Sequence, residues 1–412
     1  MQSLIVADGL GWIGDWYNLT GDSSDYVIDQ IPGWATAEGR AGSPTPNVRR
    51  WAAESCSGSW SPASDWPLFA EKARELIEVE DVAAVFGCWT SVSRKSVLPV
   101  FEELDSILFY PVQYEGEESS KNVFYTGAAP NQQAIPAVDY LMEQGVKRWV
   151  LAGTDYVYPR TTNKILEAYL KAKGVAADDI MINYTPFGHS DWQSIVADIK
   201  KFGSAGKKTA VVSTINGDAN VPFYKELGNQ GVSASDIPVV AFSVGEEELS
   251  GIDTKPLVGH LAAWNYFMSV EDETNDAFIE SWQKFIKSEE RVTNDPMEAH
   301  YIGFNMWVEA VKKAGTTDPK AVGEAIIGVA VPNLTGGYSA MMPNHHITKP
   351  VLIGEIQDDG QFQVVWQTSG LVAGDAWSDY LEGSKDIIAD WRPPLACGNY
   401  NVKTAKCSGQ NF

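Results

Sequence analysis

The sequence has no long hydrophobic run, and none of its segments reaches the roughly 20 apolar residues that a membrane-spanning helix needs. Basic residues are scarce beside acidic ones, 31 against 54 in 412 residues, which gives a formal net charge of −23. Because such an excess of negative charge repels phosphate, nucleic acid and anionic membrane surfaces are poor partners. A neutral or cationic small ligand is compatible with this charge, although acidity also serves solubility alone.

Cysteine and histidine are also rare, which limits metal and redox chemistry. The 4 cysteines form no CxxC pair, and the 5 histidines have no metal-ligand partner at helical spacing, so we predict no metal site. Cys397 and Cys407, with nine residues between them, either close a small disulfide loop, as in an oxidising compartment, or remain two thiols. The N-terminal residues show no export signal, which conflicts with the disulfide interpretation.

One enzyme-like motif is present, Gly9-Leu-Gly11-Trp-Ile-Gly14, directly after the apolar run Leu4–Ala7. It has the GxGxxG spacing of dinucleotide-binding proteins, which works only where a helix follows and meets the pyrophosphate. Residues 15–22 are a poor helix sequence, so we expect no cofactor here. The sequence also has no P-loop, HExxH or nucleophile-elbow motif, and we expect no catalytic residues. The alternative, that this motif does bind a cofactor, would make the protein an NAD-dependent enzyme.

From about residue 63 the patterns of helix and strand alternate. Short apolar segments such as Val82–Gly87 and Arg148–Gly153 are separated by amphipathic stretches of roughly 10 to 15 residues. This alternation predicts parallel sheets built from βαβ units, and the length fits two domains. Near the end, residues 351–356 and 362–366 flank the turn at Asp358–Gly360 and predict a β-hairpin.

Polar and aromatic side chains follow four of the predicted strands. They are Trp89 and Ser91 after residues 82–87; Tyr110 at the end of 107–110, with Gln113 and Tyr114 after it; Tyr156 and Tyr158 after 148–153; and Asp218 after 209–213. Ligands of open α/β sheets bind outside the carboxyl ends of the strands, so we expect these loops to converge on one crevice. Tyrosine and tryptophan offer flat apolar faces with one hydrogen-bonding edge. The alternative is that these aromatic residues only cap the core of each domain.

The same segments resemble the urea-binding proteins of ABC transporters. The resemblance is carried by Gly87–Lys95, Tyr110–Gly116, Ala129–Gln132 and Gly153–Arg160, and it runs from about Ser61 to Phe412. Short-chain-amide-binding proteins and the amide sensor of aliphatic amidase operons share this pattern. The resemblance implies an α/β type I periplasmic binding protein: two doubly wound lobes joined by three crossovers, with an interlobe cleft. Lobe I would comprise residues 61–126 and 263–333, lobe II residues 127–262 and 334–385, and the C-terminal tail residues 386–412.

Carried over from the family, the ligand-binding residues are Trp89, Ser91, Tyr110, Gln113, Tyr114, Tyr156, Tyr158, Asp218, Ser243 and Glu246. The implied function is a periplasmic solute receptor, not an enzyme, that captures urea or a short-chain aliphatic amide and delivers it to an ABC permease. Urea is planar and uncharged, and each of its polar atoms left unpaired on binding would cost about 1–3 kcal/mol. The alternative is a cytoplasmic amide-sensing regulator of an amidase operon, which would need neither export nor a disulfide.

Residues 1–60 depart from the family pattern. They show no signal peptide, and the first strand and its site loop are not recognisable in them. We hypothesise a frameshift or a misassigned start in the gene. On this interpretation the first strand of lobe I is missing or replaced.

Overall fold

The structure is a computed structural model that describes residues 3–7, 66–250, 253–381, 387–388, 400–401 and 406–407. It divides into two compact units. Unit 1 comprises residues 1–112, 119–127 and 270–348, and unit 2 comprises residues 113–118, 128–269 and 349–412. These bounds differ from the expected lobes chiefly at residues 113–118 and 263–269, which belong to unit 2, and at residues 334–348, which belong to unit 1.

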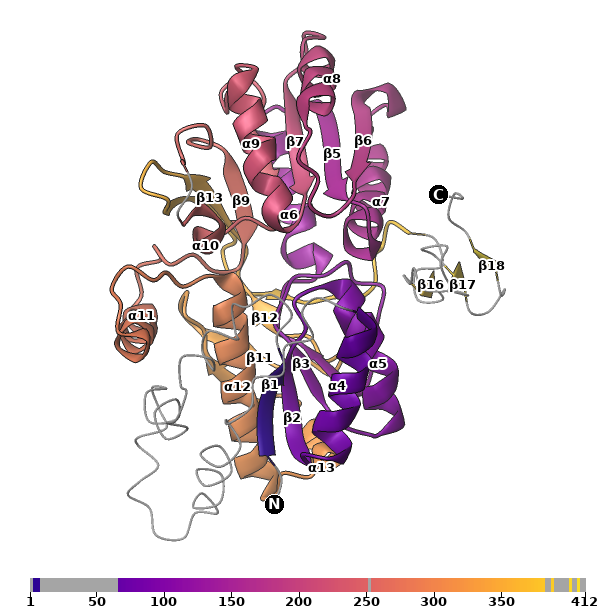
Figure 1. The fold of residues 1–412 in the computed structure, drawn as a ribbon, viewed down its shortest axis with the longest axis vertical. Helices are drawn as coiled ribbons and strands as arrows, with labels where there is room; N and C mark the ends of the chain where they lie inside the picture. The colour runs from indigo at the N-terminus through magenta and orange to yellow at the C-terminus, as the bar shows by residue number, and fades with distance from the viewer. Residues whose placement is uncertain are drawn as a thin grey trace. The chain divides into compact units, whose positions relative to one another are not determined.

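Unit 1 contains a four-stranded parallel sheet (Figure 1). Its strands, in spatial order, are β1 (Ser3–Ala7), β2 (Val82–Gly87), β3 (Leu108–Tyr110) and β4 (Val123–Tyr125). The sequence analysis expected the first strand of this unit to be missing or replaced, and a five-residue strand, β1, pairs in parallel with β2. The apolar run of residues 4–6, which contains the β-branched residues Ile5 and Val6, suits a strand of this type.

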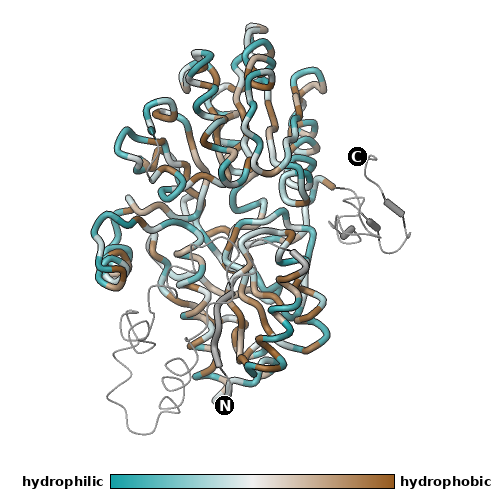
Figure 2. The backbone as a smooth tube through the Cα atoms, viewed as in Figure 1, coloured by the Kyte–Doolittle hydropathy of each residue, from teal (hydrophilic) through white to brown (hydrophobic). Residues whose placement is uncertain are grey.

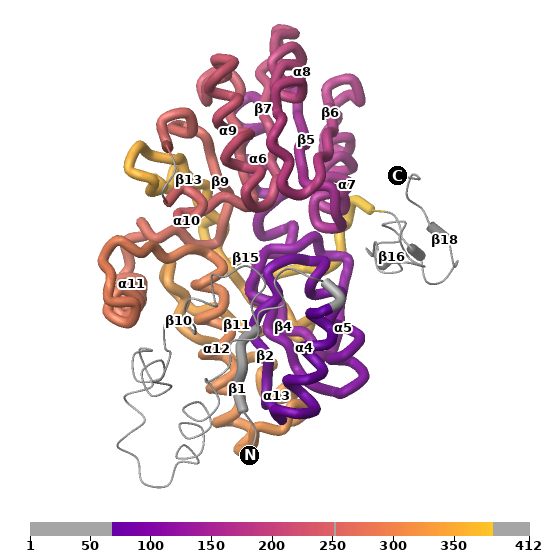
Figure 3. Tube along the Cα trace, viewed as in Figure 1, coloured from indigo at the N-terminus to yellow at the C-terminus, as the bar shows by residue number. Residues whose placement is uncertain are grey.

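The helices of unit 1 come from two distant parts of the chain, as the indigo and orange segments of Figure 3 show. They are α4 (Trp66–Glu78), α5 (Ser91–Glu103), α11 (Glu273–Ile286), α12 (Asp295–Ala314) and α13 (Pro319–Ala325). Helix α12 packs on β2 and β3, where Trp307 and Ile302 join Phe86 and Phe109 in one buried cluster. A short antiparallel pair, β10 (Ala330–Pro332) and β11 (Tyr338–Ala340), completes the unit.

Unit 2 contains a seven-stranded mixed sheet. Its spatial order is β14 (Phe362–Gln367), β13 (Leu352–Ile356), β9 (Leu261–Trp264), β8 (Val239–Ala241), β7 (Thr209–Thr214), β5 (Arg148–Thr154) and β6 (Ile180–Thr185). The five strands from β9 to β6 are parallel, and the β13–β14 pair is the predicted antiparallel hairpin. The α/β fold class expected from the sequence is therefore confirmed.

Helices cover the sheet of unit 2 on both faces (Figure 1). They are α6 (Ala134–Glu143), α7 (Val157–Ala172), α8 (Gln193–Gly203), α9 (Asn220–Asn229) and the short α10 (Glu246–Leu249). Helices α6 and α7 share a buried cluster with alternate residues of β5, β7 and β8, including Trp149 and Val212. Helices α8 and α9 lie over the face turned toward the viewer in Figure 1. Because both faces are covered, the inner strands β7 and β8 are buried along their whole length, and hydrophobic segments in this unit are drawn brown in Figure 2.

The remaining elements are short. They are the 3-10 helices η2 (Pro130–Gln132), η3 (Ala177–Asp179) and η4 (Gly217–Ala219), and the strands β12 (Thr348–Lys349), β15 (Val372–Ala373), β16 (Ile387–Ile388), β17 (Tyr400–Asn401) and β18 (Lys406–Cys407). Among the helices of the described residues, none combines the length and the apolar character that a membrane crossing requires.

Candidate functional site

In unit 2 the carboxyl ends of β7 and β8 lie at one edge of the sheet, because these two neighbouring strands are parallel. Asn216 follows β7 and Ser243 follows β8. The backbone N–H of Asn216 donates to Oγ1 of Thr154 at the end of β5, at 2.9 Å. Three neighbouring strands therefore position the two side chains.

Three side chains at this edge, Gln113, Asn216 and Ser243, form one hydrogen-bonded cluster, named the Ser243 group below. Ser243 Oγ accepts from Gln113 Nε2 at 2.9 Å and from Asn216 Nδ2 at 3.1 Å. Gln113 Nε2 also donates to the backbone carbonyl of Phe242 at 2.8 Å. Since a carbonyl only accepts, this bond fixes which end of the Gln113 amide carries the NH₂.

The Ser243 group leaves two hydrogen-bond acceptors unused. Gln113 Oε1 and Asn216 Oδ1 are both buried, and neither accepts a hydrogen bond from any residue that the structure describes. Gln113 is only 4% exposed and Ser243 only 7%. A buried polar atom without a partner costs about 1–3 kcal/mol, so a small molecule that brings N–H donors to these oxygens gains that free energy on binding.

The loop that carries Ser243 is fixed by three further hydrogen bonds. Trp264 Nε1 donates to the carbonyl of Val244 at 2.8 Å, and Glu246 Oε1 accepts from the backbone N–H of Met268 at 2.6 Å. Glu248 Oε2 accepts from the N–H of Gly245 at 2.7 Å, and burial raises the pKa of the Glu248 carboxyl to about 7. One oxygen of Glu246, a predicted ligand residue, therefore holds the loop in place.

The predicted tyrosines of unit 2 lie near a third aromatic residue. The rings of Tyr156 and Tyr158, at the start of α7, have centroids 6.2 Å apart, and Phe187 lies 4.8 Å from Tyr156. Phe187 follows β6 and is 46% exposed. Phe187 was not among the predicted ligand residues, although it follows β6 as those residues follow their own strands. Tyr114, also predicted, is buried, and its backbone N–H donates to the carbonyl of Ala128 at 3.0 Å.

In unit 1 the turn from β2 to α5 carries Trp89, which is half-buried, and the N-cap Thr90. Cys88 in this turn has φ 71°, which is uncommon for a residue other than glycine. Thr90 Oγ1 accepts from the N–H of Ser93 at 3.2 Å, and Ser93 Oγ accepts from the N–H of Thr90 at 3.1 Å. This capping box fixes the start of α5, where the predicted residue Ser91 lies.

Ser91 and Tyr110, two predicted residues of unit 1, lie on either side of a buried arginine. Arg94 Nη1 donates to Ser91 Oγ at 3.3 Å, and the Arg94 guanidinium lies 4.5 Å from the centre of the Tyr110 ring. The sequence analysis quoted Arg94 within a motif and did not select it. Its position three residues after Ser91 on one helix, hence on the same face, was the available signal.

The structure thus brings together Ser91 with Tyr110, Gln113 with Ser243, and Tyr156 with Tyr158. Asp218 is exposed on η4, and no described contact joins it to the Ser243 group. Asn216, two residues earlier in the same loop, is hydrogen-bonded to Ser243 instead. The ligand role of each of these side chains remains a prediction. Cys397, and the side chain of its predicted disulfide partner Cys407, lie outside the described residues.

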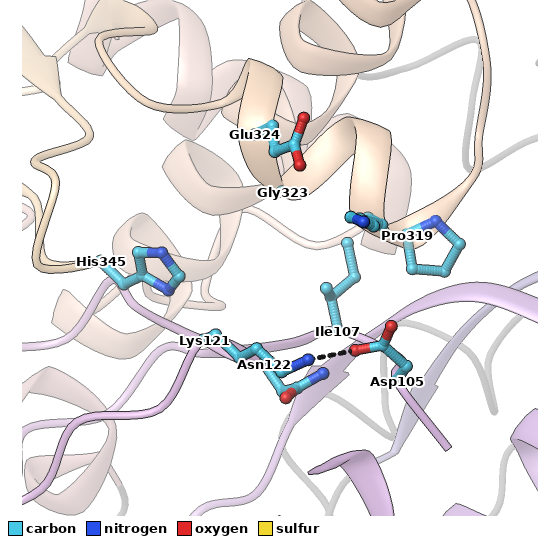
Figure 4. A pocket seen from close by; sticks show the side chains of 9 residues that line it. Asp105, Ile107, Lys121, Asn122, Pro319, Gly323, Glu324 and His345 are labelled. Atoms are coloured by element: carbon cyan, nitrogen blue, oxygen red, sulfur yellow. Dashed lines mark hydrogen bonds and ion pairs between the residues drawn. The ribbon is translucent and has the colours of Figure 1, made fainter. Parts of the chain in front are cut away.

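Unit 1 also has a cavity of about 310 Å³ at the amino ends of β3 and β4 (Figure 4). Asp105, Lys121 and Asn122 line one side of it, and Lys121 Nζ pairs with Asp105 Oδ1 at 2.7 Å. Residues of α13 and His345 line the other side. None of the predicted ligand residues contributes to this cavity, which lies at the opposite end of β3 from Tyr110.

Comparison with protein families matches residues 58–383 to a family described as "Periplasmic binding protein domain". A stretch of 115 residues is 29% identical to a Geobacillus stearothermophilus protein named limonene hydroxylase. That stretch covers 28% of this chain and 21% of the other protein. The chain therefore spans only about a fifth of that relative's length, and the match carries no statement about its activity.

Solved structures with a similar fold include several solute-binding proteins. The chain is similar to a Rhodopseudomonas palustris HaA2 solute-binding protein of an ABC transporter, solved in complex with p-hydroxybenzoic acid. The TM-score is 0.73 at 18% identity, and the match covers 90% of this chain and 98% of that one. A Burkholderia xenovorans branched-chain amino acid ABC transporter ligand-binding protein gives TM-score 0.70, 15% identity, and coverage of 89% and 95%. A Burkholderia mallei periplasmic binding protein gives TM-score 0.70, 14% identity, and coverage of 90% and 95%. At these identities the similarity shows the fold.

Proposed function

The chain belongs to the periplasmic binding protein domain family, and from this premise we propose that it is a receptor that binds urea or a short-chain aliphatic amide. In this proposal the receptor works in the periplasm and delivers its ligand to the permease of an ABC transporter. The similar solved structures include solute-binding proteins of such transporters, and their ligands, as named, include an aromatic acid. The ligand of this chain therefore has to be argued from its own side chains.

The pair of unused acceptors in the Ser243 group carries the proposal. Gln113 Oε1 and Asn216 Oδ1 are oxygens of uncharged amides, and both lack a hydrogen-bond donor among the described residues. A carboxylate group offers only acceptors and would be repelled by these oxygens. Urea offers four N–H donors and a primary amide offers two, all in the plane of the molecule. The chemistry of the Ser243 group therefore favours amides over carboxylates.

The small size of such a ligand limits its affinity. Urea has four heavy atoms, and the best small ligands gain about 1.5 kcal/mol per heavy atom, so the upper bound is about 6 kcal/mol. This free energy corresponds to a dissociation constant of roughly tens of micromolar. Reaching that bound requires every donor to find an acceptor, and the two buried amide oxygens supply part of this set without reorganisation.

A panel of ligands tests the proposal by thermal unfolding and titration calorimetry. The ligands are urea, formamide and acetamide, with p-hydroxybenzoate and leucine as carboxylate comparators. We expect the amides to raise the unfolding temperature, since a ligand at 100 times its dissociation constant adds about 2.7 kcal/mol of stability. A shift with p-hydroxybenzoate or leucine, and none with urea or any amide, would contradict the proposed ligand class.

The predicted ligand residue Ser91, in unit 1, has its own test. Ser91→Ala removes a hydroxyl that accepts from Arg94 and that the sequence analysis assigns to the ligand. We expect weaker urea or amide binding, with a change of about fivefold or more, because one neutral hydrogen bond contributes about 1 kcal/mol. Ser96→Ala is the matched control, since Ser96 lies on the same helix and its hydroxyl donates to the carbonyl of Val92.

A further inference from the structure

Asn216 is the least constrained member of the Ser243 group. The hydrogen bond recorded for its side chain runs from Nδ2 to Ser243 Oγ at 3.1 Å, and its position is set by the backbone bond to Thr154. Its Oδ1 is buried and has no donor among the described residues. Gln113 differs, because its Nε2 is held by the carbonyl of Phe242 as well as by the hydroxyl of Ser243.

The partner of Asn216 is able to reverse its role. Ser243 Oγ belongs to a hydroxyl, which either accepts or donates a hydrogen bond. If residue 216 carried a carboxylate of the same size, the Ser243 hydroxyl would rotate and donate to it, so the contact would be kept. The same exchange at Gln113 would place a carboxylate against the Phe242 carbonyl, and neither group has a donor for the other. Of the two amide side chains in the Ser243 group, only Asn216 can therefore be replaced by a carboxylate without loss of its hydrogen bond.

We propose that Asn216 makes this receptor selective for uncharged ligands that carry N–H donors over cations of the same shape. This inference rests on the proposed function and names the residue that sets its ligand class. Guanidinium has the shape of urea, and acetamidinium has the shape of acetamide, but each carries a positive charge. Burying a charge without an opposite charge is strongly unfavourable, and the amide oxygens of Asn216 and Gln113 do not supply one. A carboxylate at position 216 would supply it.

The experiment compares four ligands on the wild-type protein and on Asn216→Asp, by titration calorimetry at low salt. The ligands are urea, acetamide, guanidinium and acetamidinium. We expect the wild-type protein to bind the two uncharged ligands more tightly than their cationic counterparts. For Asn216→Asp we expect the preference between urea and guanidinium to shift toward the cation by about tenfold or more, since charge-assisted hydrogen bonds are about twice as strong as neutral ones.

Asn183→Asp is the matched control. Asn183 on β6 is half-buried, as Asn216 is, and its Oδ1 also lacks a donor among the described residues. In the sheet of unit 2, β5 and β7 separate β6 from β8, the strand that leads to Ser243. We expect this variant to keep the wild-type ligand preference. Asn216→Ser, which removes the amide oxygen without adding charge, provides a second variant and should weaken urea binding without any gain for guanidinium.

The outcomes separate the two proposals. If the wild-type protein binds neither urea nor any amide, the proposed function fails, and this inference fails with it. If the wild-type protein binds urea or acetamide, and both Asn216→Asp and Asn216→Ser keep the wild-type affinities for all four ligands, the proposed function stands and the role of Asn216 is refuted. An equal shift in Asn183→Asp would also refute it, because added negative charge elsewhere in unit 2 would then suffice.

Discussion

Gly153, on β5, shows how single residues hold the candidate site together. A methyl group at this position would lie 2.4 Å from Thr214 Oγ1 and 2.7 Å from Cβ of Pro159. Gly153→Ala would therefore push β5 away from β7, the strand pair that positions Asn216. We expect a loss of about 1–3 kcal/mol in the free energy of unfolding, measured by chemical or thermal denaturation.

Gly370→Ala is the control for this change, because nothing lies within 4 Å of the added methyl group there. We expect its stability to equal that of the wild-type protein within about 0.5 kcal/mol. Equal unfolding temperatures for the two variants would show that β5 and β7 tolerate a wider separation than the structure indicates.

At the same scale, sequence reasoning found part of the Ser243 group. Gln113 was selected because it follows a strand and lies in a family motif, and Ser243 was carried over from the family resemblance. Asp218 was selected instead of Asn216, since a sequence pattern does not resolve which residue of a loop turns inward. Gly217 has φ 65°, and η4 begins there, so the backbone changes direction between the two residues and Asp218 is exposed. This geometry depends on the packing of β5 against β7, which no local pattern encodes.

At the scale of elements, the start of α5 depends on Thr90. Its hydroxyl accepts from the N–H of Ser93, and helix N-caps of this type contribute about 0.5–2 kcal/mol. We expect Thr90→Ala to lower the unfolding temperature, as measured by differential scanning calorimetry. Thr90→Ser keeps the cap oxygen and should retain most of the stability. If the two variants were equally destabilised, the loss would come from the methyl group of Thr90 and not from the cap.

The elements themselves were largely predictable. The predicted strand at residues 82–87 has the bounds expected, and the hairpin has the expected partners. Two buried strands were not predicted, β4 (Val123–Tyr125) and β9 (Leu261–Trp264). Both are too short to show a period, and β9 contains two alanines, which are uncommon in strands. Their position is fixed by neighbouring strands in the sheet, which is a tertiary effect.

At the scale of the whole molecule, each unit contains a histidine that resists protonation. Burial lowers the pKa of His260 in unit 2 and of His300 in unit 1 to about 4. In the unfolded chain each histidine takes up a proton near pH 6.5, so the unfolded state binds more protons than the native state at lower pH. The stability that these groups contribute is therefore complete above about pH 6.5 and falls as the pH drops toward 4. We expect losses of order 3 kcal/mol for each histidine across this range.

Thermal unfolding at several pH values between 4 and 7 measures this dependence. His260 Nδ1 accepts from the backbone N–H of Val239 at 3.0 Å, and the side-chain oxygen of asparagine lies at a similar place. His260→Asn therefore keeps an acceptor while it removes one titrating group. We expect the pH dependence of this variant to be shallower than that of the wild-type protein. An unchanged slope would mean that other groups, and not the buried histidines, cause the acid sensitivity.

The interleaving of the two units along the chain has a consequence for synthesis. Unit 1 takes its last residues from positions 270–348, after most of unit 2, and unit 2 takes its last strands from residues beyond 349. A ribosome that has reached residue 269 has released neither unit in full: the first lacks α12 and α13, and the second lacks β13 and β14. Both hydrophobic interiors therefore stay open in the nascent chain until the final third emerges, and they close almost together.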